Sequence, residues 1–297
     1  MITYFQAIII GLLQGVTELF PISSLGHSVV VPWLLGWDSI LHSESSGESF
    51  FLPFLVALHV ACALALFIFY RKTWYRIITG FFGSLGKRRI DTPDAKLAWL
   101  LIVATIPAGV IGLAFEHTLR TQFAKPLSAI VFLGINGLIL LAGEHYKQRA
   151  ERGKTLEQST VATTKQVSSK LTFGRAVIIG VAQVGALFAG ISRSGITMLG
   201  GLVSGLNNQD AARFSFLLAT PIIFAAGIVK LPDLFGSLGK GVHGQIFAGS
   251  IVAGVAAYLA VKYLDKYFEK RSLRPFAVYC LGLCAVLLGV GFVRGHF

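Results

Sequence analysis

The sequence predicts an all-α integral membrane protein with six transmembrane helices and two re-entrant helix pairs, arranged as an inverted-topology repeat. Three observations support this prediction. Of the 297 residues, 54% are apolar and only 13% are charged, whereas a soluble domain carries about 25% charged residues. Several apolar runs are longer than a barrel strand needs, so the spans are predicted to be helical. Two further apolar stretches are interrupted by glycine and polar residues at matching positions.

The net charge of +12 comes from Lys and Arg residues that cluster between the apolar runs. Such clusters are orientation signals, because cytoplasmic loops of membrane proteins carry an excess of basic residues. The expected partners are therefore the lipid bilayer with its anionic surface, or an anionic substrate, and no nucleic acid. The three cysteines lie inside apolar runs and are expected as small buried side chains, not as disulfides or a metal site: Cys62, Cys280 and Cys284.

The chain begins with two short apolar pieces, 2–19 and 29–37, separated by a turn rich in proline, serine and glycine. Neither piece makes a comfortable span. They are predicted to form a re-entrant pair, which dips into the membrane and returns to the same side. A single kinked span from Ile2 to Val31 is the alternative.

Six later runs are predicted to cross the bilayer, and the first of them has the length of about 20 residues that suffices for a full span. They are Phe50–Tyr70, Leu97–Phe115, Leu127–Gly143, Phe214–Val229, Ile246–Val261 and Phe276–Val293. The polar segment 38–49 is predicted to be a loop, and so is the basic segment 71–96. With six spans, this segment, the basic linker 144–172 and the basic cluster at 262–274 all fall on one side. That side is predicted to be cytoplasmic, with both termini on the outer side.

The chain is predicted to be a single membrane domain, 1–297, built from two related halves. Half one is 1–143 and half two is 173–297, which opens with two glycine-rich pieces, Phe173–Ala189 and Ile196–Leu206. An odd number of spans separates the two broken segments, so the second enters from the opposite face. Such repeats place a binding site where the broken helices meet. At an offset of 169 residues the matching pairs are Gly11 and Gly180, Gln14 and Gln183, Ile22 and Ile191, Ser23 and Ser192, Gly26 and Gly195, and Ser28 and Thr197.

The two copies carry different polar residues, and polar groups at membrane depth usually have a functional reason. The first copy brings Glu18, Ser23, Ser24 and His27, and the second brings Ser192, Arg193, Ser194 and Thr197. Arg193 precedes a short helix, whose free N–H groups and dipole also attract anions. This combination favours a phosphate over a carboxylate, with both left open. The alternative is that Arg193 reaches out to water.

Ser24 and His27 are three residues apart at a turn, so they can lie on one side as nucleophile and base. Glu18 could then orient the imidazole or hold a metal ion. Helix capping by Ser23 or Ser24 is the structural alternative, as is an imidazole bonded to a carbonyl group for His27. His59, in the middle of a span, is expected to make a packed polar contact.

Two motifs carry a resemblance to a known family. The segments T-E-L-F-P-I-S-S-L-G-H (17–27) and G-I-S-R-S-G-I-T (190–197) resemble the signatures of undecaprenyl-diphosphatases of the bacitracin-resistance type. The resemblance implies an inner-membrane enzyme that hydrolyses undecaprenyl diphosphate to undecaprenyl phosphate and inorganic phosphate at the periplasmic face. It recycles the lipid carrier for peptidoglycan synthesis and gives resistance to bacitracin, which competes for the substrate.

The resemblance also implies roles for individual residues. Glu18, Ser24 and His27 match the catalytic motif, and Arg193 belongs to both the catalytic and the phosphate-binding sets. The remaining phosphate-binding candidates are Ser23, Ser192, Ser194 and Thr197. A divalent cation, Mg²⁺ or Ca²⁺, is implied, with Glu18 as its ligand.

The chain departs from the family pattern at two positions. Gln14 stands where a second glutamate is usual, which weakens a two-carboxylate metal site, and Ala189 replaces a usual proline. A transporter or flippase for prenyl lipids or anions is the competing function, because inverted repeats with broken helices also build transporters. Whether the protein forms a homodimer is left open.

Overall fold

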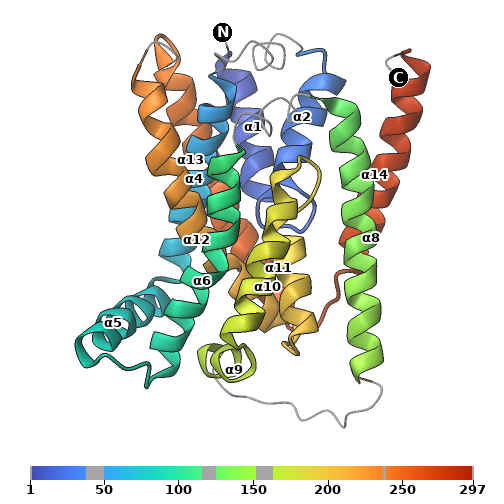
Figure 1. Ribbon diagram of the computed structural model, residues 1–297. Helices are drawn as coiled ribbons and strands as arrows, with labels where there is room; N and C mark the ends of the chain where they lie inside the picture. The colour runs from blue at the N-terminus through green and yellow to red at the C-terminus, as the bar shows by residue number, and fades with distance from the viewer. Residues whose placement is uncertain (1, 38–49, 116–124, 152–162, 237–238, 296–297) are drawn as a thin grey trace.

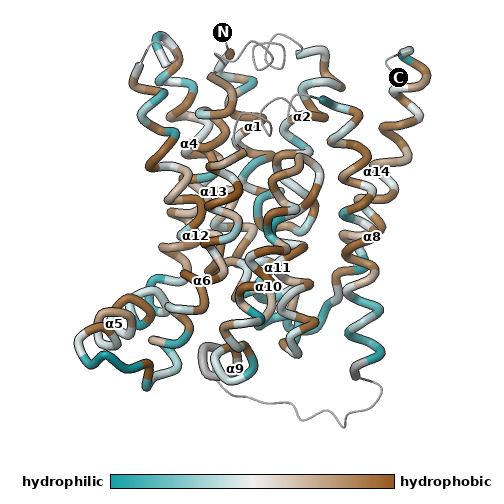
Figure 2. The backbone as a smooth tube through the Cα atoms, viewed as in Figure 1, coloured by the Kyte–Doolittle hydropathy of each residue, from teal (hydrophilic) through white to brown (hydrophobic). Residues whose placement is uncertain are grey.

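The computed structural model describes residues 2–37, 50–115, 125–151, 163–236 and 239–295, and every regular element in these ranges is a helix. Six of the helices are long and apolar enough to cross a membrane, which confirms the predicted number of spans. They are α4 (Phe51–Phe69), α6 (Pro93–Ala114), α8 (Pro126–Glu151), α12 (Asn208–Lys230), α13 (His243–Tyr267) and α14 (Arg274–Val293). They form a bundle, and hydrophobic residues are frequent along its helices (Figure 2). Many large apolar side chains are exposed, as contact with lipid requires.

The prediction of a loop at 71–96 was wrong, because most of this segment is helix α5 (Arg71–Lys87). One side of α5 packs against α6: the Trp99 Nε1–H donates to Ser84 Oγ at 3.0 Å, and the Phe81 and Trp99 rings lie 5.2 Å apart. The basic residues of α5 favoured a loop, although the apolar residues between them form the face that contacts α6. The predicted linker also contains helix α9 (Thr163–Lys170), and α8 extends beyond Gly143. The central part of that linker, 152–162, and the predicted loop at 38–49 lie outside the described residues.

Four shorter helices lie on either side of the two motif turns: α1 (Tyr4–Thr17), α2 (Ser24–Leu34), α10 (Phe173–Gln183) and α11 (Arg193–Val203). A 3₁₀ turn, η1 (Val184–Leu187), follows α10, and another, η2 (Leu231–Phe235), extends α12. The longest of the four, α1, has 14 residues, or about 21 Å at 1.5 Å per residue, against roughly 30 Å of hydrocarbon. None of these four helices is long enough to cross the membrane alone.

The helix starts repeat at the offset of 169 residues found in the sequence. Thr3 caps α1 and Thr172 caps α10, each by accepting the N–H of the third residue on. Ser23 and Ser192 cap α2 and α11 in the same way, and both of these helices have 11 residues. Side-chain oxygens at such positions satisfy backbone donors that have no partner within the helix.

The short helices also pack in the same way. Gly11 of α1 lies against the backbone of Gly249 in α13, and Gly180 of α10 lies against the backbone of Ala104 in α6. A Cβ atom at either glycine would overlap a carbonyl oxygen, so only glycine permits this approach. In Figure 1, α1 and α2 lie at the end of the bundle that holds both termini, whereas α10 begins beside α9 at the opposite end. The turns after α1 and α10 therefore meet inside the bundle.

Candidate active site

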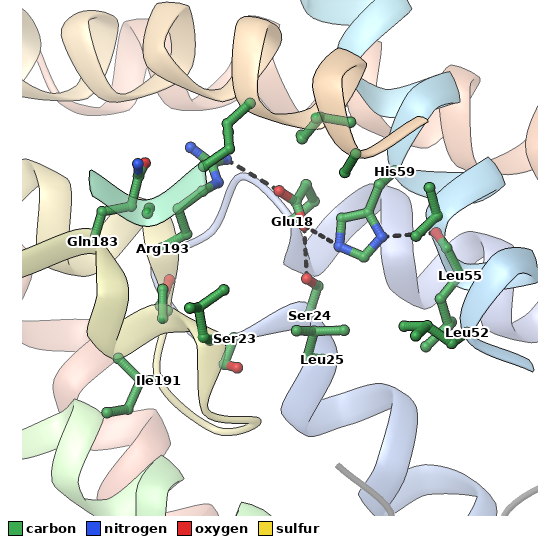
Figure 3. Close-up of a pocket in the computed structure, with 18 residues that line it drawn as sticks. Glu18, Ser23, Ser24, Leu25, Leu52, Leu55, His59, Gln183, Ile191 and Arg193 are labelled. Atoms are coloured by element: carbon green, nitrogen blue, oxygen red, sulfur yellow. Dashed lines mark hydrogen bonds and ion pairs between the residues drawn. The ribbon is translucent and has the colours of Figure 1, made fainter. Parts of the chain in front are cut away.

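The carboxylate of Glu18 lies at the centre of the site, where α1 ends. Its side chain is buried, with 6% of the residue exposed. Oε2 accepts hydrogen bonds from Ser24 Oγ at 2.6 Å and from Gln14 Nε2 at 3.0 Å. His59 Nε2 lies 3.2 Å from the same oxygen, and Arg193 Nη2 donates to Oε1 at 3.0 Å (Figure 3). Burial of a carboxylate is costly without partners, and these four groups compensate for it.

Arg193 is the first residue of α11, so its guanidinium group and the positive end of the helix dipole lie together. Nη1 donates to the carbonyl oxygen of Ser215 at 3.2 Å, while Nη2 holds Glu18. Because a guanidinium group has five N–H donors, Arg193 can bind an additional anion or exchange Glu18 for one. A phosphate fits this arrangement of donors.

The two turns that carry these groups are joined directly. Ser23 adopts a φ of 69°, and its Oγ accepts the N–H groups of both Gly26 and Gly190. Gly190 itself has a φ of 110°, and a Cβ there would collide with the backbone of α8. Asn136 of α8 connects the turns again, because it accepts the Ser192 N–H at 2.9 Å and donates to the Pro21 carbonyl at 3.0 Å. The turns are thus held in one fixed relative position.

A cavity of about 240 Å³ is lined by residues of both turns. Its polar wall contains Glu18, Ser23, Ser24, His59, Ser192 and Arg193 (Figure 3). Its apolar wall comes mainly from α4 and α12, through Leu52, Leu55, Ile222 and Ile223. A small polar end and a larger apolar wall suit a ligand with an anionic head and a hydrocarbon tail.

Five predicted site residues line this cavity, namely Glu18, Ser23, Ser24, Ser192 and Arg193, whereas His27, Ser194 and Thr197 do not. His27 Nδ1 lies 2.7 Å from the Ser23 carbonyl oxygen, and Nε2 lies 2.8 Å from the Tyr279 hydroxyl. Glu18, and not His27, is therefore placed to accept the proton of the Ser24 hydroxyl group.

Ser194 and Thr197 lie behind the cavity wall and hold α11 in place. Ser194 Oγ donates to the Phe20 carbonyl at 3.2 Å and lies 2.9 Å from Ser192 Oγ. Thr197 Oγ1 lies 2.7 Å from Ser215 Oγ on α12. Both hydroxyls can support Arg193 from behind, without reaching the cavity.

The sequence did not place His59 in the site. Its Nδ1 makes the expected packed contact, with the Leu55 carbonyl at 2.7 Å, but Nε2 faces Glu18 inside the cavity. Gln183 also lines the cavity, and its Oε1 is buried with no hydrogen-bond partner among the described residues. In the sequence, each of these two residues is a polar residue within an apolar run. This pattern indicates a buried polar contact but does not show which residue the side chain contacts.

The residues around Glu18 do not fit the divalent cation that the family resemblance implies. Within the described ranges, no three His, Cys, Asp or Glu side chains come together closely enough to hold a metal ion. Both oxygens of Glu18 already face N–H and O–H donors, two of them on Arg193 and His59. Gln14 contributes one neutral oxygen, Oε1, at the position where a second carboxylate is usual in the family pattern.

Comparison with known proteins gives a consistent result. A family model described as "Bacitracin resistance protein BacA" matches residues 7–286. An undecaprenyl-diphosphatase of Mycolicibacterium paratuberculosis is 51% identical, over 94% of this chain and 94% of the relative. Undecaprenyl-diphosphatase 2 of Frankia alni is 46% identical over 97% of this chain and 99% of the relative, and the protein of that name from Burkholderia ambifaria is 44% identical over 96% and 94%.

Proposed function

The chain belongs to the BacA family of bacitracin resistance proteins, and from that premise we propose that it hydrolyses undecaprenyl diphosphate to undecaprenyl phosphate and inorganic phosphate. The reaction returns the lipid carrier to peptidoglycan synthesis, and bacitracin competes for the same substrate. One observation carries the proposal: a serine hydroxyl, a carboxylate and a guanidinium group are joined in one cavity with an apolar wall.

In the proposed complex the terminal phosphate occupies the position in front of Arg193. It replaces Glu18 on Nη2 and also meets the N–H groups of the first turn of α11, which have no intrahelical acceptor. The first isoprene units then lie along Leu55 and Ile223, on the apolar wall. Release of Glu18 from Arg193 makes the carboxylate a stronger base at the moment when substrate is bound.

Ser24 Oγ attacks the terminal phosphorus, and Glu18 accepts the hydroxyl proton along their 2.6 Å hydrogen bond. The bond from phosphorus to the bridging oxygen breaks, Glu18 passes the proton to that oxygen, and undecaprenyl phosphate leaves. Arg193 stabilises the negative charge that spreads over the phosphoryl oxygens. Water then gives a proton to Glu18 and attacks the phosphoserine, the bond from phosphorus to Ser24 Oγ breaks, and Glu18 returns the proton to Ser24 Oγ as inorganic phosphate is released. Direct attack by water, with Glu18 as base, is the variant.

This proposal moves the role of base from His27 to Glu18. Since a carbonyl oxygen only accepts hydrogen bonds, His27 Nδ1 donates to the Ser23 carbonyl, and the ring supports the strained turn before Ser24. The Tyr279 hydroxyl on α14 meets the other ring nitrogen. His27 is thus assigned to positioning the nucleophile.

We further propose that the pairs α1–α2 and α10–α11 are re-entrant and related by an inverted repeat of 1–143 and 173–297. The matching caps at Thr3 and Thr172, and at Ser23 and Ser192, support this relationship. Helices α5 and α9 lie at the end opposite the termini (Figure 1). Since the basic segments mark the cytoplasmic side, the termini and the mouth of the α1–α2 pair face the periplasm.

Phosphate release from C55 prenyl diphosphate by purified protein in detergent tests the proposal. The wild-type chain is expected to release phosphate, and both Ser24→Ala and Arg193→Ala should lose at least about 10²-fold in rate. If the wild-type protein releases no phosphate but moves the lipid between leaflets of a vesicle, the transporter alternative holds instead.

A further inference from the structure

We infer that the side chain of His59 takes the place of a divalent cation beside Glu18, so that this chain catalyses its reaction without a metal ion at that carboxylate. The inference rests on the proposed hydrolysis and concerns how the same site is charged. It depends on His59, which lies outside both sequence motifs, and on Gln14, whose side chain is neutral.

The hydrogen bonds of His59 define where its protons are. Nδ1 lies 2.7 Å from the Leu55 carbonyl oxygen, which can only accept, so Nδ1 carries a proton. Nε2 lies 3.2 Å from Oε2 of Glu18, an oxygen that also accepts from Ser24 and Gln14. A carboxylate with three further donors is ionised, so Nε2 also donates to it. The ring is therefore an imidazolium, and Glu18 lies between two cations.

A divalent ion at Glu18 would have to displace these partners. Mg²⁺ requires near-octahedral oxygen ligands and Ca²⁺ requires six to eight, whereas the described residues around the cavity offer one carboxylate, that of Glu18, and the unpaired amide oxygens of Gln14 and Gln183. The ion would also lie close to the positive charges of His59 and Arg193, and such repulsion is strong in a buried site. The charge that a metal would supply is already present.

His59 also stabilises Glu18 when substrate binds. When the substrate phosphate takes over Arg193, Glu18 loses one of its two cationic partners, and an unpaired buried carboxylate is costly. His59 remains bound to Glu18, because its Nδ1 anchors it to its own helix at Leu55. It keeps the carboxylate ionised and directed toward Ser24. His59 is thus a positioning residue that acts through Glu18.

Two measurements on the wild-type protein test the inference. Phosphate release after EDTA treatment should stay within about twofold of the rate with added Mg²⁺ or Ca²⁺, since the cationic side chains supply the charge. Titration of the substrate-free protein with Mn²⁺, followed by electron paramagnetic resonance, should detect no ion bound at stoichiometric level. A loss of activity in EDTA that Mg²⁺ or Ca²⁺ restores, or stoichiometric Mn²⁺ that Glu18→Gln removes, would overturn the inference.

Variants then separate His59 from a structural role. His59→Gln should lose about tenfold or more in EDTA, as outer partners of catalytic carboxylates do, while exposed His145→Gln on α8 should not. The double variant Gln14→Glu, His59→Gln restores two carboxylates and removes the competing cation, so Mg²⁺ or Ca²⁺ should rescue it. Full activity of His59→Gln in EDTA would refute the role of His59. If no variant or wild-type preparation releases phosphate with or without metal, the proposed function itself fails.

Discussion

The hydroxyl oxygen of Ser24 lies 2.6 Å from Oε2 of Glu18, in the turn between α1 and α2. The carboxylate is therefore already in contact with the proton that the nucleophile must lose. A proton acceptor and a nucleophile in direct hydrogen-bond contact are the arrangement that covalent phosphoryl transfer needs.

This contact predicts that Ser24→Ala and Glu18→Gln each reduce kcat by at least about 10²-fold, because one removes the nucleophile and the other removes the base. The measurement is phosphate release from a prenyl diphosphate at saturating substrate. Ser28→Ala is the matched control on the same helix. The Ser28 hydroxyl is buried without a partner among the described residues, so its removal should leave kcat unchanged. Normal turnover by Ser24→Ala would favour direct attack by water.

His27 is predicted to tolerate one substitution and not another. Asparagine can still donate an N–H to the Ser23 carbonyl, as Nδ1 does, so His27→Asn should keep activity within about tenfold of wild type. His27→Ala removes that bond and should lose more, and Tyr279→Phe should have only a small effect. If His27 were the general base, both variants would be equally inactive. The comparison of kcat for the two variants decides between these roles.

Arg193→Lys should lose most of the activity although it keeps the charge. A guanidinium group can bind the Ser215 carbonyl and a phosphate at once through its planar fork, whereas an ammonium group is a point charge. We expect a fall of roughly 10²-fold in kcat/KM. Product inhibition by inorganic phosphate should weaken in parallel. An unchanged inhibition constant for phosphate would contradict the assignment of Arg193 to the phosphate.

The sequence was sufficient for the features that depend on local pattern. Six apolar runs predicted six spans, and the repeated serines at 23 and 192 predicted two equivalent turns. His59 was not placed, because an isolated histidine in an apolar run does not show which distant residue it meets. Its partner Glu18 follows α1, whereas His59 lies in the span α4, and only the packing of α1 beside α4 brings the two together. Helix α5 was not predicted, because its many basic residues indicated a loop and the apolar residues that pack on α6 are scattered among them.

Gly190 should be the most sensitive glycine in the site. Its φ of 110° and the backbone of α8 both exclude a side chain, so Gly190→Ala adds strain of about 1–3 kcal/mol and a steric clash. The thermal midpoint in detergent should fall by roughly 5 °C or more. Gly174→Ala, at an open position in α10, is the control and should be neutral or slightly stabilising. Equal midpoints for both variants would show that the contact between the turns is not rigid.

The proposed orientation predicts which loops can be labelled from the periplasm. Arg89 lies at the basic end beyond α5, and Lys240 lies exposed before α13, near the opposite end. In a background without Cys62, Cys280 and Cys284, single variants Arg89→Cys and Lys240→Cys are exposed to a maleimide that cannot cross membranes. Lys240→Cys should react in intact spheroplasts, and Arg89→Cys only after the cells are broken, because basic segments stay in the cytoplasm. The reverse pattern would show the opposite orientation, with the mouth of the α1–α2 pair on the cytoplasmic side. The diphosphate head would then have to be hydrolysed there, before the carrier reaches the outer leaflet.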